Sequence, residues 1–359
     1  MKYPAVLSFR DVLPNLAQFD TIIDVRSPGE FAEDHIPGAV NYPVLDDEQR
    51  VKIGTMYKQC GSFEAKKLGA ALVARNIANH IETQLLKHPH HWKPLVYCWR
   101  GGNRSGSMAH ILAKIGWPVV QVDGGYKAYR HHVNEMMSTL PQTLHFIVLC
   151  GPTGSGKSHM LRKLNEKGAQ VLDLEKIAAH RGSVLGSLPT CPQPSQKKFE
   201  TMLWDHLRNF DPALPVFIES ESKKVGNLRV PEALMTQMRT SLCVNIDLSM
   251  PNRVQLLMNE YDHFVHDPVG LNKRLNYLTQ LHGKDKVEQW HQWATEGRMD
   301  TLVEDLLFRH YDPAYSKSIR QNFDCFAHAL NITIKDISDQ AFEEAITTLL
   351  AKTSSVHHA

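Results

Sequence analysis

The segment Gly151–Ser158, "GPTGSGKS", constrains the fold of this chain more than any other feature. It follows the apolar run "LHFIVLC" and precedes a helical pattern, so it meets the phosphate-loop pattern G-x-x-x-x-G-K-[ST] in its required strand–loop–helix context. The glycines let backbone N–H groups surround a phosphate, Lys157 supplies a positive charge, and Ser158 is placed to hold a magnesium ion. The predicted phosphate- or diphosphate-binding residues are Gly151, Gly154, Gly156, Lys157 and Ser158.

Acidic residues at the ends of two later apolar runs are candidates to assist a magnesium ion at this loop. Asp173 and Glu175 follow one run, and Glu219 and Glu221 end another. Magnesium is commonly held through one or two carboxylates together with substrate phosphates, although either pair is equally well explained as solvated loop acids. We expect Asp173, Glu175 and Glu219 to be the assisting acids, and we expect no structural metal.

A second segment, Val96–Ser107 or "VYCWRGGNRSGS", places one cysteine between a predicted strand and the helical pattern Ser107–Ile115. Small and basic residues at such a turn aim several backbone N–H groups at one point, which forms an anion-binding nest. Positive potential there favours a thiolate at Cys98, whereas a structural interpretation makes it a buried core residue. Because Arg100 and Arg104 have no packing reason to flank a core cysteine, we expect a nucleophile.

Apolar runs and helical patterns alternate along the chain, which predicts an α/β fold in two units. Short β-branched runs at 21–25, 95–97 and 118–122 belong to the first unit, with a helical stretch over 64–86, and the polar, proline-containing "STLPQT" ends it. Further apolar runs at 170–174, 215–218 and 242–248 predict a parallel sheet in the second. From about residue 252 onward the sequence has few strand-like runs and mainly helical patterns. The predicted divisions are 1–138, 142–250 and a mostly helical C-terminal region, 251–359.

Cysteine usage and hydropathy bear on where such a nucleophile would work. The six cysteines show neither a C-x-x-C pair nor a dense framework, which favours a reducing compartment where Cys98 stays free. The chain has no long apolar run and no signal-like start, so we expect a cytoplasmic protein without membrane association. The net charge of +2 does not by itself indicate a polyanion partner, but a local basic face fits within a balanced total.

Three segments of the first unit, in order and spacing, resemble the signatures of the rhodanese family. They are Ile22–Pro43, the Cys98 loop and Val122–Arg130. The resemblance implies a rhodanese-like α/β domain that carries sulfur or selenium on the loop cysteine. Two features depart from the family pattern. Arg104 lies six residues after Cys98, the spacing of cysteine phosphatases with their wider oxyanion loop, and the segment 42–96 is longer than a minimal rhodanese needs.

With "CWRGGNRSGS", "GGYKA", "GPTGSGKS", "DLE" and "HRGS" in one chain, the sequence resembles the tRNA 2-selenouridine synthase family. The resemblance covers most of the chain to about residue 250 and, more loosely, the helical end. It implies a P-loop NTPase-like second domain and a transferase that replaces the 2-thio sulfur of a tRNA wobble uridine with selenium from selenophosphate. It also implies an S-geranylated intermediate made from geranyl diphosphate, and selenium carried on Cys98 as S-selanylcysteine.

The residues fit this chemistry. Alkylation turns a thiocarbonyl sulfur, a poor leaving group, into a thioether that can be expelled, and a phosphate loop is suited to grip the diphosphate of the alkyl donor. The predicted residues that hold the oxygens of selenophosphate are Arg100, Gly101, Gly102 and Arg104. Arg100, like its neighbour Trp99, alternatively faces the RNA. We expect a monomer that binds tRNA, with magnesium as an assisting ion and no tightly bound cofactor.

Two other classes of function remain open. A cysteine phosphatase or sulfurtransferase fused to a small-molecule kinase fits the loop spacing, although Trp99–Arg104 contains no acid to protonate a leaving group. A non-enzymatic, nucleotide-gated binding protein does not need a nucleophile, yet Cys98 is present. The phosphate-loop pattern itself does not distinguish a nucleotide from another diphosphate ester.

Overall fold

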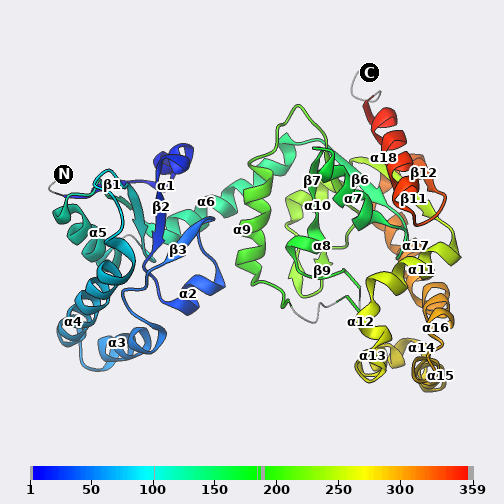
Figure 1. Cartoon of the computed structure of the whole chain (residues 1–359), viewed down its shortest axis with the longest axis horizontal. Helices are drawn as coiled ribbons and strands as arrows, with labels where there is room; N and C mark the ends of the chain where they lie inside the picture. Colours follow the sequence, from blue (N-terminus) through cyan, green and yellow to red (C-terminus); the bar gives the residue numbers. More distant parts are fainter. Residues whose placement is uncertain (1–2, 101, 184, 187–190, 355–359) are drawn as a thin grey trace. The chain divides into compact units, whose positions relative to one another are not determined.

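A computed structural model describes residues 3–100, 102–183, 185–186 and 191–354. The chain divides into two compact units, one formed by Met1–Met137 with Ser195–Asp205 and the other by Ser138–Pro194 with His206–Ala359 (Figure 1). Both are α/β, which confirms the predicted fold class. Within the described part of the chain, no helix is both long and apolar enough to cross a membrane.

The first unit is built on a five-stranded parallel sheet with the order β1-β5-β4-β2-β3. Its strands are β1 (Ala5–Leu7), β2 (Thr21–Asp24), β3 (Ala39–Asn41), β4 (Pro94–Tyr97) and β5 (Val120–Val122). The three predicted runs became β2, β4 and β5, whereas the short edge strands β1 and β3 were not predicted. Cys98 directly follows β4, the central strand, so it lies at the carboxyl edge where parallel α/β sheets place their sites.

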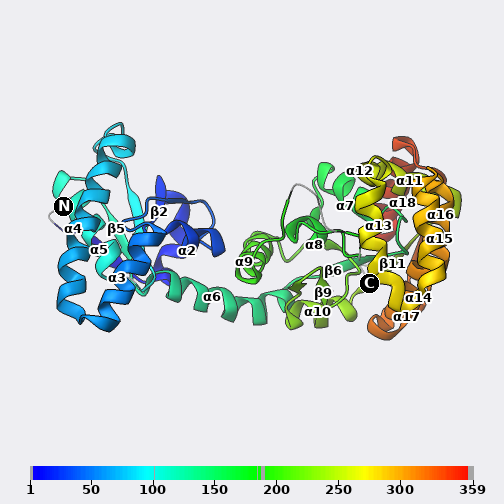
Figure 2. The same cartoon turned by 90° about the horizontal axis from the view of Figure 1, so that it is seen from below.

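The helices of this unit cover the sheet and account for the long segment 42–96. They are α1 (Phe9–Val12), α2 (Pro28–Glu33), α3 (Asp47–Gln59), α4 (Ser62–His80), α5 (Asn103–Ile115) and α6 (Gly125–Thr139), with single turns η1 (Leu13–Gln18) and η2 (Ile81–Leu85). In both views α4 and α5 lie together (Figures 1 and 2). Met108 and Leu112 of α5 and Ile77 of α4 share a buried core with Ile23 and Val96 of the sheet.

Most of α9 (Gln196–Leu207) belongs to the first unit although it lies far along the chain. The Tyr129 hydroxyl donates to Oγ1 of Thr201 at 2.9 Å, and the Thr201 hydroxyl donates to Oδ2 of Asp34 at 3.0 Å. Asp34 also accepts a 2.8 Å hydrogen bond from the Tyr126 hydroxyl. These buried polar contacts fix α9 against α6 and against Asp34, which follows α2, a connection that no local pattern predicts.

The second unit is built on another five-stranded parallel sheet, with the order β12-β11-β6-β8-β7. Its strands are β6 (Phe146–Cys150), β7 (Gln170–Leu172), β8 (Val216–Glu219), β11 (Leu242–Leu248) and β12 (Leu330–Ile334), and β9 (Lys224–Val225) pairs with β10 (Leu228–Arg229) apart from it. The strand β6 is central, and the phosphate loop leaves its carboxyl end. The mostly helical C-terminal region also supplies an edge strand, β12, which was not predicted from the sequence.

Two apolar clusters organise the helices of the second unit. One joins the sheet to α7 (Lys157–Glu166) and α18 (Asp339–Ser354), and the other lies among the helices that follow α11. The remaining helices are α8 (Leu174–Ile177), α10 (Glu232–Arg239), α11 (Met250–Glu260), α12 (Asp262–Val265), α13 (Pro268–Leu275), α14 (Thr279–His282), α15 (Lys284–Thr295), α16 (Met299–Leu306) and α17 (Asp312–Asn322), with single turns η3 (Leu140–Thr143), η4 (Asn276–Leu278), η5 (Leu307–Tyr311) and η6 (Asp324–His328).

Candidate functional site

Cys98 is buried at the end of β4, with its sulfur in contact with a serine from the first turn of α5. The Ser105 hydroxyl donates to Sγ of Cys98 at 3.3 Å and accepts a 3.2 Å hydrogen bond from Nε2 of Gln121. Burial alone would raise the pKa of the Cys98 thiol. The hydrogen bond from the Ser105 hydroxyl, together with backbone N–H groups of Ser105, Arg100 and Gly102, outweighs burial and holds that pKa below its ordinary value.

The loop arginines play less part in this shift than the sequence suggested, because the largest contributions that lower the pKa come from the serine hydroxyl and the backbone. Arg100 is exposed, as is Gly102, and the predicted loop residue Gly101 lies outside the described residues. Arg104 donates from both terminal nitrogens to the carboxylate of Glu30, at 2.7 and 3.4 Å. The structure thus places Arg104 in a partly buried ion pair beside the loop.

The "DVR" and "GGYKA" segments of the sequence supply residues that support the Cys98 loop. The Arg26 guanidinium donates to Asp24 at 2.6–3.1 Å and to the Asp34 carbonyl at 2.6 Å. The guanidinium carbon also lies 3.9 Å from the ring centroid of Tyr126. The backbone N–H of Tyr126 in turn donates to the Cys98 carbonyl at 2.7 Å. The ring of Trp99 lies 5.4 Å from that of Tyr126, so this tryptophan contacts the scaffold.

In the phosphate loop, the glycines adopt conformations that other residues rarely take. Gly154 and Gly156 have φ of 79° and 90°, and a Cβ on Gly154 would lie 2.9 Å from the side chain of Leu257. The Lys157 ammonium donates to the Gly151 carbonyl at 2.6 Å, and the Ser158 hydroxyl donates to Glu175 at 3.0 Å. The five predicted residues thus lie between the end of β6 and the first two residues of α7.

Residues from the helical region brace this loop, and none of them was predicted from the sequence. The Arg253 guanidinium of α11 donates twice to the Thr153 carbonyl, at 2.9 and 2.7 Å, and forms two hydrogen bonds with Asp312, at 3.0 and 2.6 Å. The Gly151 N–H donates to the Tyr315 hydroxyl at 2.6 Å. These contacts join positions about 60 to 165 residues apart, so no local spacing identifies them.

The predicted acidic residues gather near Ser158 but in different roles. Asp173 caps α8 by accepting the Lys176 N–H at 2.7 Å, and burial raises the pKa of Asp173. Glu219, fully buried at the end of β8, accepts the Glu175 N–H at 2.8 Å through Oε1. Burial and neighbouring carboxylates hold its pKa well above the ordinary range, and burial likewise raises the pKa of Glu175.

Two oxygen-bearing side chains beside the phosphate loop could serve as ligands of a magnesium ion. Among the described residues, no group of three or more His, Cys, Asp or Glu side chains is arranged to hold a metal ion. Magnesium, however, commonly takes only one or two protein oxygens and completes its shell with phosphate oxygens and water. The Ser158 hydroxyl and the Glu175 carboxylate, 3.0 Å apart, meet that smaller requirement.

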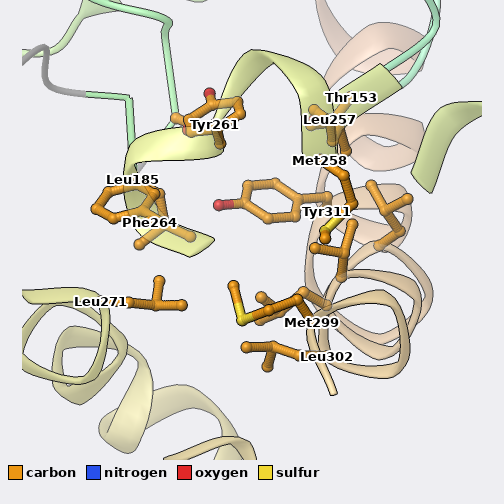
Figure 3. A pocket seen from close by; sticks show the side chains of 14 residues that line it. Thr153, Leu185, Leu257, Met258, Tyr261, Phe264, Leu271, Met299, Leu302 and Tyr311 are labelled. Carbon is orange, nitrogen blue, oxygen red and sulfur yellow. The ribbon is translucent and has the colours of Figure 1, made fainter. Parts of the chain in front are cut away.

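An apolar pocket lies beside the phosphate loop and shares Thr153 with it (Figure 3). Thr153 of the loop is one of its lining residues, and the others come chiefly from α11, α16 and η5. The second unit therefore combines a phosphate-binding loop with an adjoining hydrocarbon surface, whereas the first unit holds a buried cysteine with a lowered pKa.

In the comparisons with known proteins, two different family models match the two parts of the chain. Residues 10–132 match the model of the rhodanese-like domain, and residues 144–270 match the model described as "tRNA 2-selenouridine synthase AAA domain". Proteins described as tRNA 2-selenouridine synthase are similar over much of the chain. The protein of Sulfurovum sp. (strain NBC37-1) is 35% identical over 89% of this chain and 93% of its own. The protein of Shewanella halifaxensis is 33% identical over 84% of this chain and 90% of its own. The protein of Nitrosomonas europaea is 35% identical over 71% of this chain and 66% of its own.

Proposed function

Because this chain belongs to the tRNA 2-selenouridine synthase family, we propose that it replaces the sulfur of wobble-position 2-thiouridine in tRNA with selenium from selenophosphate. One observation carries the proposal beyond family membership. Cys98, in a loop that lowers its pKa, occurs in the same chain as a phosphate loop with an adjoining apolar pocket. A soft nucleophile and a site for an alkyl diphosphate are the two elements that a sulfur-to-selenium exchange by alkylation needs.

The phosphate loop is proposed to bind geranyl diphosphate for the first half-reaction. The thiocarbonyl sulfur of the base forms a bond to C1 of the geranyl group, the C1–O bond breaks, and pyrophosphate leaves with the bonding electrons while the proton on N3 is released. Lys157 and the loop N–H groups are positioned to stabilise the negative charge that develops on pyrophosphate. Ser158 and Glu175 would hold a magnesium ion, which when bound supplies further positive charge at the leaving group.

The second half-reaction replaces the alkylated sulfur. Selenium forms a bond to C2 of the base, the C2–S bond breaks, and geranylthiolate leaves with the bonding electrons. Phosphate is released before this transfer, when selenium is loaded onto Cys98 and water takes the phosphoryl group as the Se–P bond breaks. We propose that the Cys98 loop carries out this step, with Arg100, Gly102 and Arg104 nearest to the phosphate oxygens of selenophosphate.

Cys98 is proposed to carry selenium as S-selanylcysteine, and the electron balance of that form sets a requirement. A thiolate sulfur and the selenium of selenophosphate are both fully reduced, so forming an S–Se bond removes two electrons. A two-electron acceptor of the disulfide class takes them, and a thiol returns them when selenium passes to the base. The exchange on tRNA is therefore redox-neutral overall, and the loaded protein is heavier by one selenium atom.

The experiment that tests the function is mass analysis of wobble nucleosides from cells that lack this gene and carry wild-type or variant protein. Lys157→Ala should leave 2-thiouridine, because the diphosphate is not gripped, yet still convert pre-geranylated tRNA. Cys98→Ala should accumulate S-geranyl-2-thiouridine, and Cys60→Ala, at an exposed cysteine outside the loop, should behave as wild type. If wild type forms no 2-selenouridine, the function is wrong. If both variants stop the same half-reaction, the division between the two units is wrong.

A further inference from the structure

The apolar pocket of the second unit has no role in holding phosphate, and its composition is unusual for a site beside a phosphate loop. Its cavity volume is about 60 Å³. None of the fourteen described residues that line it carries a charged side chain. Leu, Met, Phe and Tyr side chains supply most of its surface (Figure 3).

The polar atoms in the lining are already engaged. The Tyr311 hydroxyl, which extends across the pocket in Figure 3, is hydrogen-bonded to the Ser183 side chain and to the backbone of Leu185. Burial raises the pKa of Tyr311, so the phenol stays neutral. A ligand in this pocket therefore meets a hydrocarbon surface with few free hydrogen-bonding groups, which favours an apolar chain over a base or a sugar.

The pocket begins at the phosphate loop itself. Thr153 is a loop residue and a lining residue, and Leu257 both lines the pocket and lies close enough to Gly154 to exclude a Cβ there. The pocket and the loop thus share Thr153 and adjoin where Leu257 packs against Gly154. Leu271, Met299 and Leu302 lie on the side away from Thr153 in Figure 3. These three side chains are between 1 and 5% exposed, so the pocket is closed there.

We propose that this pocket holds the hydrocarbon chain of a prenyl diphosphate whose diphosphate lies on the phosphate loop, and that Met299 and Leu302 limit the length of chain accepted. The proposal rests on the proposed function, in which geranyl diphosphate is the alkyl donor. It goes further by naming the residues that recognise the prenyl chain and by explaining why the length of the prenyl chain matters. The loop alone recognises any diphosphate, so selection for the prenyl group falls to the pocket.

The expected size of this selection follows from the burial of methylene groups. Each buried methylene favours binding by about fourfold. Five additional carbons therefore give geranyl diphosphate an advantage over dimethylallyl diphosphate on the order of 100- to 1,000-fold. A longer chain gains nothing once it reaches a closed end, because overpacking a filled site is unfavourable. Farnesyl diphosphate should consequently bind no better than geranyl diphosphate.

Binding of a series of ligands to the full-length wild-type protein tests the pocket first. The ligands are inorganic pyrophosphate and dimethylallyl, geranyl and farnesyl diphosphates, measured by titration calorimetry in the presence of magnesium. We expect affinity to rise steeply up to geranyl diphosphate and then to stop rising. Equal affinity for pyrophosphate and geranyl diphosphate would overturn the pocket proposal, since the chain would then contribute nothing.

Two variants at the closed end and one matched control test which residues limit the chain. Leu302→Ala opens space at the closed end, so the ratio of the affinity for farnesyl diphosphate to that for geranyl diphosphate should increase about tenfold or more. Leu302→Phe fills that space, so the affinity for geranyl diphosphate should fall about tenfold while the affinity for pyrophosphate stays unchanged. Leu278→Ala is the control, because Leu278 is equally buried in the same helical cluster but does not line the pocket. The same ratio in Leu302→Ala and Leu278→Ala would show that Leu302 does not limit the chain.

These measurements separate the pocket from the proposed function. Tight, chain-selective binding of geranyl diphosphate without geranylation of tRNA would support the pocket and overturn the proposed half-reaction. Geranylation of tRNA with no preference for chain length would support the half-reaction and overturn the pocket. Lys157→Ala should lose the binding of pyrophosphate and of geranyl diphosphate, whereas Leu302→Phe should keep the binding of pyrophosphate. This pair of results would support both the half-reaction and the pocket.

Discussion

The Ser105 hydroxyl donates a 3.3 Å hydrogen bond to Sγ of Cys98 while accepting a 3.2 Å hydrogen bond from Nε2 of Gln121. Because Gln121 donates to the Ser105 oxygen, the hydroxyl proton is available to an acceptor, and Sγ of Cys98 and the Gly102 carbonyl both lie 3.3 Å away. This side-chain relay, rather than the arginines alone, gives the loop a specific means of stabilising a thiolate.

Ser105→Ala should therefore raise the pKa of Cys98 toward its ordinary value. A hydrogen bond to a charged group contributes about 1.5–3 kcal/mol, so alkylation of Cys98 by iodoacetamide at neutral pH should slow about tenfold. The measurement is the rate of alkylation against pH, with peptide mass analysis to identify the cysteine. Ser107→Ala is the control, because the Ser107 hydroxyl donates only to the Asn103 carbonyl within α5. An unchanged pH profile in Ser105→Ala would mean that the backbone N–H groups suffice.

The elements that form within a short stretch of the chain could be predicted from the sequence. Each strand–loop–helix segment that carries a candidate site was recognisable, because strand, turn and helix follow one another within about twenty residues, and both loops lie as expected at the carboxyl ends of central strands. The strand β12 was missed because its partner β11 lies more than 80 residues earlier and its short, edge-strand pattern is weak evidence by itself.

The contacts that tune the two sites could not be predicted for the same reason. Glu30 meets Arg104 across 74 positions, and Arg253 meets Thr153 across 100. A glutamate at the start of one helix and an arginine at the start of another are each ordinary surface residues when considered alone. Only the tertiary fold brings them together, so a single sequence identifies the nucleophile and the phosphate loop but not what holds them.

Arg104→Lys tests whether the wide loop recognises the phosphate part of selenophosphate. Arginine donates to an oxyanion through two parallel N–H groups, and lysine cannot reproduce that geometry. Losing one such contact costs about 1.5–3 kcal/mol, so the KM for selenophosphate should rise by about ten- to a hundredfold, with geranyl diphosphate binding unaffected. The check is the rate of selenation of geranylated tRNA against selenophosphate concentration. An unchanged KM with a lower Tm would assign Arg104 solely to its ion pair with Glu30.

Glu30→Gln should change the dependence of stability on acid. Burial alone would raise the pKa of Glu30, but the hydrogen bond and charge of Arg104 outweigh burial and hold that pKa below its ordinary value. A carboxylate with a lowered pKa stabilises the folded state at neutral pH, and the stabilisation is lost as pH falls from its unfolded pKa, about 4.3, through the folded one. Urea unfolding should therefore show wild type more stable than Glu30→Gln at pH near 7, and the difference should disappear in acid. Glu64→Gln, at an exposed pair with Lys67, is the control and should show little difference at either pH.

The last prediction concerns Arg253, which is 5% exposed and joins the phosphate loop to α17 through Thr153 and Asp312. Arg253→Ala removes two hydrogen bonds from the Thr153 carbonyl and leaves Asp312 without its cation. The Asp312 side chain is 29% exposed, so water screens part of the loss, and the free energy of unfolding should fall by about 1–3 kcal/mol. Pyrophosphate binding should weaken as well, because the loop backbone is no longer held in its binding conformation.

The control for this experiment is Arg298→Ala, since Arg298 is largely exposed and its ion pair with Glu296 spans 3.8 Å. Its unfolding free energy should change by less than about 1 kcal/mol. Alkylation of Cys98 should be unchanged in both variants, because both arginines belong to the other compact unit. If Arg253→Ala lost stability but bound pyrophosphate as tightly as wild type, the arginine would brace the helical region only. Conversely, full stability with weakened pyrophosphate binding would show that the arginine acts on the conformation of the loop and that Asp312 finds another partner.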